Sequence, residues 1–301
     1  MSRQRVVGLL FILMMLVMEL SGIFTFFIPE QFMMDYGQFI SILIPVIIIG
    51  ILIKDGFRER FKLNGFKLST VLVCMAVAIA VLPVTGFLGD LSTFIFGRNP
   101  IGIESYVMEL KGSLFTQWII LALTPAICEE ALFRGLLLDK KAGLSIHTLA
   151  IMNGLMFSLF HIGYDQLLYT FALGVIMAYL AIITSSIFPA VILHLINNSW
   201  SILAQGAFGQ LTAEETAEMM ASQVTLSSLS MSLIYGIIGS IIIVFLIKRL
   251  MKKYKYNDRE RLKENAQDKV IYAVENKAIT YLPQIIMFFL VLLANYLLIS
   301  M

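Results

Sequence analysis

The stretch QWIILALTPAICEEALFRGLLL, residues 117–138, decides the fold class of this chain. It is long enough to cross a bilayer core of about 30 Å as a helix, and its only charges are Glu129, Glu130 and Arg134. Ionisable side chains are costly in hydrocarbon, so their presence inside a span marks a functional site by default. The stretch therefore predicts a transmembrane helix that carries chemistry.

The composition of the whole chain agrees with a membrane protein. Of the 301 residues, 59% are hydrophobic and only 14% are charged, whereas soluble domains have about 25% charged residues. The net charge of +2 is too small to indicate a nucleic-acid partner. Both cysteines, Cys74 and Cys128, lie in apolar stretches and form no recognisable disulfide framework. We expect a multi-pass integral membrane protein whose surroundings are the lipid bilayer.

Nine apolar stretches are long enough to be candidate spans, and each must be helical to satisfy its own backbone in lipid. They are residues 6–28, 38–53, 69–89, 114–137, 146–162, 167–184, 187–204, 227–247 and 281–300. The first follows MSRQR but is too long for the apolar region of a signal peptide, so we interpret it as a retained span. The predicted fold is all-α, a polytopic transmembrane bundle of about eight to nine spans.

The positive-inside rule assigns an orientation to this bundle. With the N-terminus in the cytoplasm, the cytoplasmic connections are 54–68, 138–145, 185–186 and 248–280, and most Lys and Arg residues fall in them. The opposite connections together hold only Arg98 and Lys111. FRERFKLNGFK, residues 57–67, mixes Phe with basic residues and predicts a short interfacial helix without assigned chemistry.

We divide the chain into three parts of one integral membrane domain. Residues 1–112 form N-terminal transmembrane helices, and residues 113–204 form a catalytic core of the fourth to seventh spans. Residues 205–301 form C-terminal helices with a charged cytoplasmic linker.

Helical spacing separates the two adjacent glutamates of the fourth span. Glu130 and Arg134 are four residues apart with the acid first, the favourable order for an ion pair on one helix face. Glu129 lies about 100° around the helix from Glu130 and lacks that partner. One glutamate is therefore predicted to be structural and the other free to react.

Two further spans each carry a histidine in a spaced pair. Phe157 and His161 are four residues apart, and so are His194 and Asn198, so each pair projects from one helical face. Pro125, one turn before the acids, removes a backbone hydrogen bond and is expected to loosen the helix there.

Together these groups can add water to an amide bond. A glutamate in an apolar site can act as a base, a neighbouring histidine can share a water proton, and a second histidine with an amide can stabilise an oxyanion. The alternative is a divalent metal such as zinc, held by Glu129, His161 and His194. The spacing does not match H-E-x-x-H, so a metal has to be argued from other evidence, and the residues alone leave both mechanisms open.

The three motifs, in order and on separate predicted helices, resemble those of a known family. E-E-x-x-x-R, F-x-x-x-H and H-x-x-x-N over roughly residues 113–204 are similar to the CAAX protease and bacteriocin-processing (CPBP) family of intramembrane proteases, which includes bacterial abortive-infection relatives. The resemblance implies that Glu129 activates the attacking water with help from His161, and that His194 and Asn198 steady the oxyanion. It also implies that Glu130 and Arg134 hold the helix geometry. The family has been described as metalloproteases, but a glutamate-dependent mechanism without metal is also consistent with it, so we expect no cofactor and no tightly bound metal. Spacing from His194 selects Asn198 over Asn197, which is interpreted as a packing residue.

The depth of these residues sets a geometric condition. At 1.5 Å per residue, Glu129, His161 and His194 lie about 14, 22 and 12 Å from the cytoplasmic ends of their spans. They can meet only if the fifth helix tilts, or if it begins in a recessed loop around KAGLSIH. A cavity that faces the cytoplasm would satisfy this condition and admit water.

The predicted function is an intramembrane endopeptidase of a bacterial cell membrane. Its substrate would be a membrane-bound or lipidated protein or peptide. One alternative is a proton-coupled transporter that uses Glu129 and the histidines as a relay. Another is a non-catalytic membrane partner or immunity protein on the same fold.

Overall fold

The computed structural model describes residues 30–52, 56–97, 113–139, 145–161, 163, 165–208 and 224–256. Within these ranges the chain is helical, and no strand occurs in them. The helices in chain order are α2 (Glu30–Gln38), η1 (Phe39–Leu43), α3 (Ile44–Leu52), α4 (Phe57–Arg60), α5 (Leu68–Phe96), α7 (Leu114–Trp118), η2 (Ile119–Leu123), α8 (Thr124–Glu130), η3 (Ala131–Leu137), α9 (Ile146–Phe160), α10 (Leu167–Thr184), α11 (Phe188–Phe208) and α13 (Leu226–Lys253). The predicted all-α fold class is confirmed for this part of the chain.

Seven of the nine predicted spans coincide with helices or uninterrupted runs of helices. α10 has the predicted bounds, and α7, η2, α8 and η3 together form one run over residues 114–137. Four described helices are long and apolar enough to cross a membrane, while α9 and the apolar part of α11 are shorter. The predicted spans 6–28 and 281–300 lie outside the described residues. The count of eight to nine spans and the division at residues 112 and 204 stay predictions.

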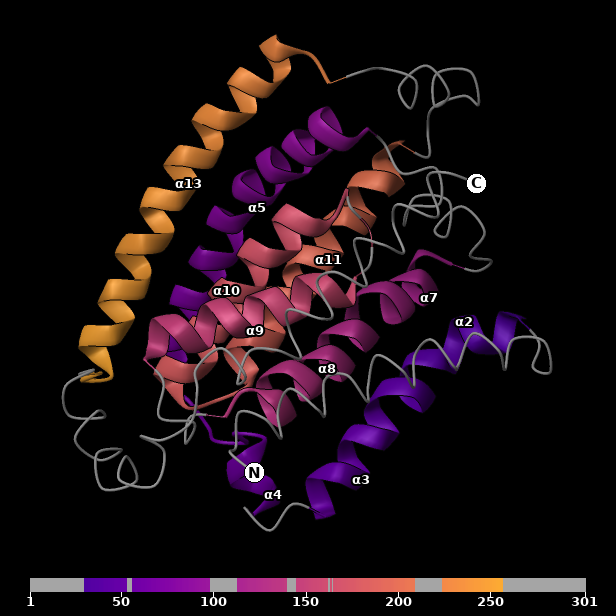
Figure 1. The fold of residues 1–301 in the computed structure, drawn as a ribbon, viewed down its shortest axis with the longest axis vertical. Helices are drawn as coiled ribbons and strands as arrows, with labels where there is room; N and C mark the ends of the chain where they lie inside the picture. The colour runs from indigo at the N-terminus through magenta and orange to yellow at the C-terminus, as the bar shows by residue number, and fades with distance from the viewer. Residues whose placement is uncertain are drawn as a thin grey trace, which may run out of the picture.

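The helix run 114–137 is enclosed by the other helices (Figure 1). α2, η1 and α3 pack along one side of α8 and η3, and α11 packs against η2 and α8. α9 and α10 form a closely packed pair, and α5 carries α13 along its outer side. The residues of the predicted fourth span therefore lie where several helices converge.

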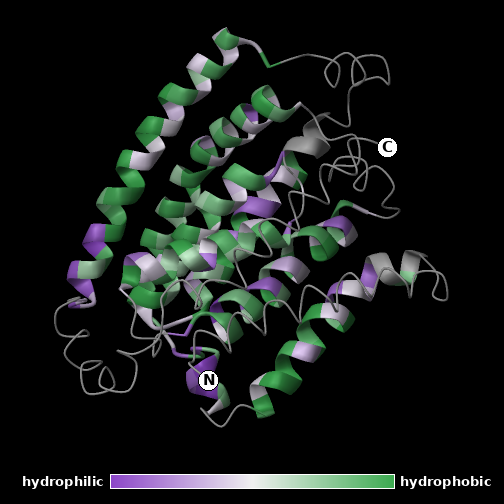
Figure 2. Ribbon diagram, in the orientation of Figure 1, coloured by the Kyte–Doolittle hydropathy of each residue, from purple (hydrophilic) through white to green (hydrophobic). Residues whose placement is uncertain are grey.

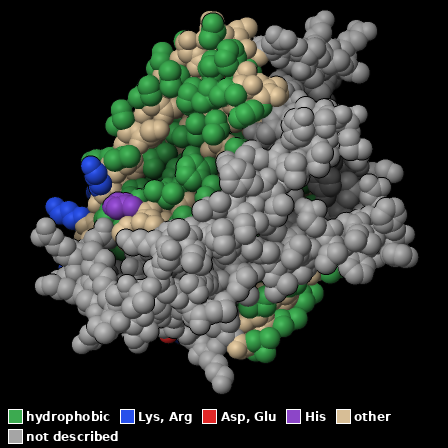
Figure 3. All heavy atoms as spheres, viewed as in Figure 1, with side chains coloured by type: hydrophobic (Ala, Val, Ile, Leu, Met, Phe, Trp, Pro, Cys, Tyr) green, Lys and Arg blue, Asp and Glu red, His purple; other side chains and the backbone are tan. Residues whose placement is uncertain are grey.

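The outward-facing side chains are mostly apolar, as expected for helices surrounded by lipid. Hydrophobic residues run along the helices in Figure 2, and hydrophilic ones lie at the end of α13, on α4 and within the helices of the central bundle. In Figure 3 a continuous hydrophobic face covers α13 and the neighbouring part of α5, with Lys and Arg side chains at one end of it. Ile234, Ile237, Ile241 and Phe245 of α13 are all exposed. These apolar helices indicate an integral membrane protein.

The connections predicted to share one side of the membrane do lie at one end of the bundle. Arg60 forms a salt bridge of 3.2 Å with Asp139, which joins the connection after α3 to the connection after η3. Asn64 donates to the carbonyl of Ser185, between α10 and α11, over 2.9 Å. Lys253, at the end of α13, donates to Ser69 Oγ over 2.8 Å. The up-and-down order of the described helices thus agrees with the predicted connectivity.

Candidate active site

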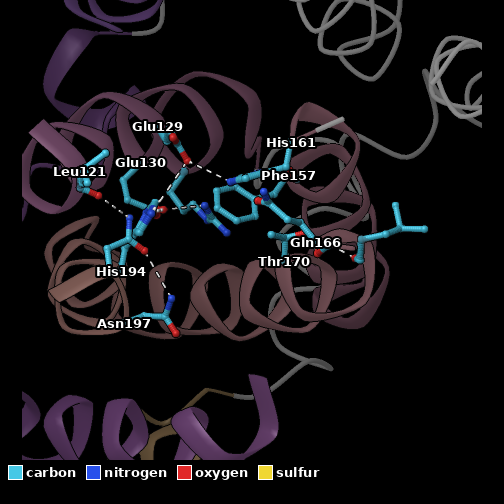
Figure 4. Close-up of polar contacts among 12 residues, drawn as sticks. Leu121, Glu129, Glu130, Phe157, His161, Gln166, Thr170, His194 and Asn197 are labelled. Carbon is cyan, nitrogen blue, oxygen red and sulfur yellow. Dashed lines mark hydrogen bonds and ion pairs between the residues drawn. The ribbon is translucent and has the colours of Figure 1, made fainter. Parts of the chain in front are cut away.

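Three of the predicted site residues converge at the centre of the bundle. Glu129 Oε2 lies 3.8 Å from His161 Nε2 and 3.9 Å from His194 Nε2 (Figure 4). Glu129 is on α8, His161 follows the last residue of α9, and His194 is on α11. The geometric condition set by their different depths is therefore met.

The Glu129 carboxylate is buried without a hydrogen bond to its Oε2 atom. Only 6% of the residue is exposed, and no donor lies within hydrogen-bonding distance of that oxygen. Separations of 3.8–3.9 Å are longer than direct hydrogen bonds of 2.7–3.2 Å. A buried polar atom without a partner is rare and calls for a functional explanation.

Glu130, the neighbouring glutamate, is fully buried and shares one oxygen between two partners. Its Oε1 accepts from Arg134 Nη1 over 2.7 Å, so the ion pair predicted from the spacing is present. The same oxygen lies 3.0 Å from His194 Nδ1, a contact that the sequence did not predict. The two glutamates thus face opposite nitrogens of one imidazole ring.

The partners of Arg134 fix its position. Its Nη2 donates to the carbonyl of Gly174 on α10 over 2.9 Å, and the guanidinium carbon lies 4.7 Å from the centre of the Phe157 ring. This reach requires α9 and α10 to pack closely. A Cβ on Gly174 would lie only 2.9 Å from the Cα of Gly154, so a glycine at that position permits the approach.

Phe157 separates the two histidine rings. Its ring centre is 4.6 Å from that of His161 and 5.7 Å from that of His194. The Phe157 backbone carbonyl lies 2.8 Å from His161 Nδ1. Since a carbonyl only accepts, His161 carries a proton on Nδ1, and in the neutral ring Nε2 is an acceptor facing Glu129.

Asn198 is held at the other end of the site by a backbone carbonyl. Its Nδ2 donates to the Leu121 carbonyl over 3.1 Å, and its Oδ1 accepts from Asn197 over 3.3 Å. Pro125 explains why this carbonyl is available, because proline has no N–H to bond the carbonyl four residues earlier. The π-helical turn η2 ends two residues before Pro125, so the loosened helix that we expected lies just before the proline.

Two basic residues of segment 57–67, Arg60 and Lys62, are buried beside the helix run 114–137, which the sequence did not predict. α4 is only four residues long, and Arg60 and Lys62 are 8% and 6% exposed. The expected short helix is thus present only over Phe57–Arg60, and its position at the membrane surface stays a prediction. A basic residue in a polar connection normally extends into solvent, so the sequence offered no signal for this burial.

The histidines and Glu129 do not match a zinc site. Bonds of 2.0–2.2 Å place two ligand atoms of a tetrahedral zinc about 3.3 Å apart, whereas Glu129 Oε2 lies 3.8 and 3.9 Å from the two nitrogens. Within the described ranges, no group of three or more His, Cys, Asp or Glu residues is positioned to hold a metal ion. The metalloprotease interpretation therefore lacks support from this geometry, and the absence of a cofactor stays a prediction.

Comparison with known families identifies the region that contains this site. Residues 111–200 match the model of the family described as type II CAAX prenyl endopeptidase Rce1-like. The match covers less than a third of the chain, and this central region is similar to that family. This Rce1-like region contains Glu129, His161, His194 and Asn198, and it confirms the resemblance to the CAAX protease family that the three motifs predicted. The proteins of that family are described as CAAX endopeptidases, which are hydrolases. No match was found among curated proteins or among solved structures.

Proposed function

We propose that this protein is an intramembrane endopeptidase in which Glu129 activates water for attack on a peptide bond. One observation carries the proposal: a buried carboxylate oxygen with no hydrogen-bond partner faces the Nε2 atoms of two histidines. The family match adds the reaction class, hydrolysis by an endopeptidase.

The reacting water would lie between Glu129 and His161. Two atoms 3.8 Å apart can both be about 2.8 Å from one water oxygen, which is an ordinary hydrogen-bond length. The water would donate one proton to the carboxylate and the other to the lone pair of His161 Nε2. The bond from His161 Nδ1 to the Phe157 carbonyl keeps that lone pair directed at the site.

The oxyanion would be stabilised by Asn198 and His194. One N–H of the Asn198 amide is used by the Leu121 carbonyl, which leaves the second for substrate. His194 would carry a proton on both nitrogens, donating one to Glu130 and the other to the developing charge. Glu130 and Arg134 would take no part in the chemical step and would only hold the His194 ring in position.

The proton balance needs no group beyond these residues. The water oxygen forms a bond to the substrate carbonyl carbon, and its proton moves to Glu129. Collapse of the tetrahedral intermediate breaks the C–N bond as Glu129 returns the proton to the leaving amine. The products are a carboxylic acid and an amine, and no covalent enzyme intermediate forms.

The substrate that we propose is a membrane-bound or lipidated protein or peptide. A site enclosed by apolar helices would be reached most directly by a substrate already held in the membrane. Prenylated substrates are suggested by the name of the matching family alone. We further propose that the site opens to the cytoplasmic side of a bacterial cell membrane.

The test compares membranes from cells that produce the wild-type protein or the Glu129→Gln variant, by mass spectrometry of their peptides. Exchange of the exposed Glu59 for Gln is the matched control. We expect a new C-terminus that forms with wild type and Glu59→Gln but not with Glu129→Gln. Identical peptide profiles, or proton flux through liposomes that depends on Glu129, would favour transport instead.

A further inference from the structure

The segment after α4 inserts between helices of the core. Phe61 is 3% exposed and packs against two glycines, Gly50 of α3 and Gly135 of η3. The next residue, Lys62, adopts a left-handed backbone with φ of 51°, a costly conformation for a residue with a Cβ. This backbone geometry brings the lysine side chain to the end of the helix run that carries the glutamates.

The end of that run has many backbone carbonyls without helical partners. An α-helix leaves its last four carbonyls unpaired, and a π-helical end leaves five, because each bond spans one residue more. η3 is π-helical over Ala131–Leu137. Asn153 donates to the Phe133 carbonyl over 2.8 Å, and Arg60 Nη2 donates to the Leu136 carbonyl over 2.7 Å.

Lys62 takes two more of these carbonyls. Its Nζ donates to the Arg134 carbonyl over 2.6 Å and to the Leu138 carbonyl over 2.8 Å. A third, longer contact of 3.2 Å goes to the carbonyl of Arg60. Three acceptors match the three N–H groups of an ammonium, whereas a neutral amine donates only two. A positive charge at the C-terminal end of a helix is also favourable.

We propose that Lys62 is a positioning residue for the reaction: by holding the Arg134 backbone, it keeps Arg134, Glu130 and His194 in the catalytic arrangement. Lys62 binds the carbonyl of the residue whose side chain holds Glu130, and Glu130 in turn holds His194. The connection after α3 would thereby control a site that it does not contact. This inference rests on the proposed function.

The proton on Lys62 makes the arrangement sensitive to pH. Burial, the largest cause, and the neighbouring Arg60 lower the pKa of Lys62 from its usual 10.5 to about 7, and Asp139 opposes this shift. Below about pH 7 the ammonium can make all three bonds, and above it the neutral amine must release one carbonyl. Lys62→Arg stays charged at every working pH. We expect the kcat of wild type, divided by the kcat of Lys62→Arg at the same pH, to fall as the pH rises through about 7.

The experiment uses the full-length protein in detergent, with Lys62→Met, Lys62→Arg and the exposed-residue control Lys67→Met. Cleavage of an internally quenched farnesylated CAAX peptide gives kcat and KM. Ring-labelled histidine gives an NMR readout that does not depend on activity. The chain has three histidines, so few signals need assignment.

For Lys62→Met we expect kcat to fall about 10- to 100-fold with little change in KM, as for a small misplacement of catalytic groups. The His194 signal should shift, Lys62→Arg should recover most of the rate, and Lys67→Met should resemble wild type. Unchanged kcat together with an unchanged His194 signal would overturn the inference.

Two further results also test the inference about Lys62. If Lys62→Met does not fold, kcat is measured for wild type and for Lys62→Arg from pH 6 to pH 8.5. A constant ratio of the two kcat values over this range overturns the inference. If wild type cleaves no peptide, the proposed function loses its support, while the His194 signal still shows whether Lys62 positions that ring.

Discussion

The two adjacent glutamates of the central helix differ in their surroundings. Glu130 is fully buried, and its Oε1 is shared by Arg134 and His194. Glu129 is nearly as buried, and its Oε2 faces two histidines at 3.8 and 3.9 Å without a hydrogen bond. The Oε2 of Glu130 also has no hydrogen-bond partner, so the two residues differ in the Arg134 ion pair and in the groups that they face. We therefore propose different purposes for the two identical side chains: the ion-paired Glu130 stabilises the fold, and Glu129, which faces the histidines, is available to react.

The largest loss of stability is expected when Glu130 is exchanged for Gln. Glu130→Gln leaves the Arg134 guanidinium buried without its counter-charge, which costs about 3–5 kcal/mol. Unfolding of the detergent-solubilised protein, followed by heat or denaturant, measures this loss, with the exposed Glu59→Gln as control. A Glu130→Gln protein as stable as wild type would contradict the structural role.

A smaller effect is expected where Arg134 reaches α10. In Gly174→Ala the new Cβ would lie 2.9 Å from the Gly154 Cα and 3.1 Å from the Phe157 Cβ, so the helices must separate. Overpacking of this kind costs about 1–3 kcal/mol. The control is Gly86→Ala in α5, where no atom lies within 4 Å of the new Cβ. Equal unfolding midpoints for the two variants would show that the close approach of α9 and α10 is not required.

A still smaller effect is expected for the exchange of Pro125. Pro125→Ala restores an N–H that competes with Asn198 for the Leu121 carbonyl. We expect kcat to fall about tenfold through a misplaced oxyanion donor, without loss of stability. Peptide cleavage and unfolding are measured on the same preparation. A loss of stability at unchanged kcat would instead assign Pro125 to the fold alone.

The sequence predicted the elements well and the contacts between them only in part. Apolar length predicted the bounds of α10 and of the run 114–137, because a membrane helix must be apolar along its full span. Spacing predicted the Glu130–Arg134 pair, because residues four apart share one face of a helix. It could not predict that His194, 64 positions later, shares the same carboxylate oxygen.

Segment 57–67 shows the limit of composition most clearly. Its basic residues were predicted to lie at the membrane surface, as basic residues in a connection usually do. Burial of Lys62 instead depends on its left-handed backbone and on the unpaired carbonyls at the end of η3. Both features arise only when distant parts of the chain pack together, so no local pattern indicates them.

The most direct test of the central claim is the rate at which purified Glu129→Gln cleaves a peptide that wild type cleaves, with its unfolding midpoint measured alongside. The exchange removes the base but keeps the shape and burial of the side chain. We predict a fall in kcat of about 10²- to 10⁴-fold, the usual contribution of a general base, with an unfolding midpoint no lower than that of wild type. Cleavage at the wild-type rate by a folded Glu129→Gln protein would contradict the account.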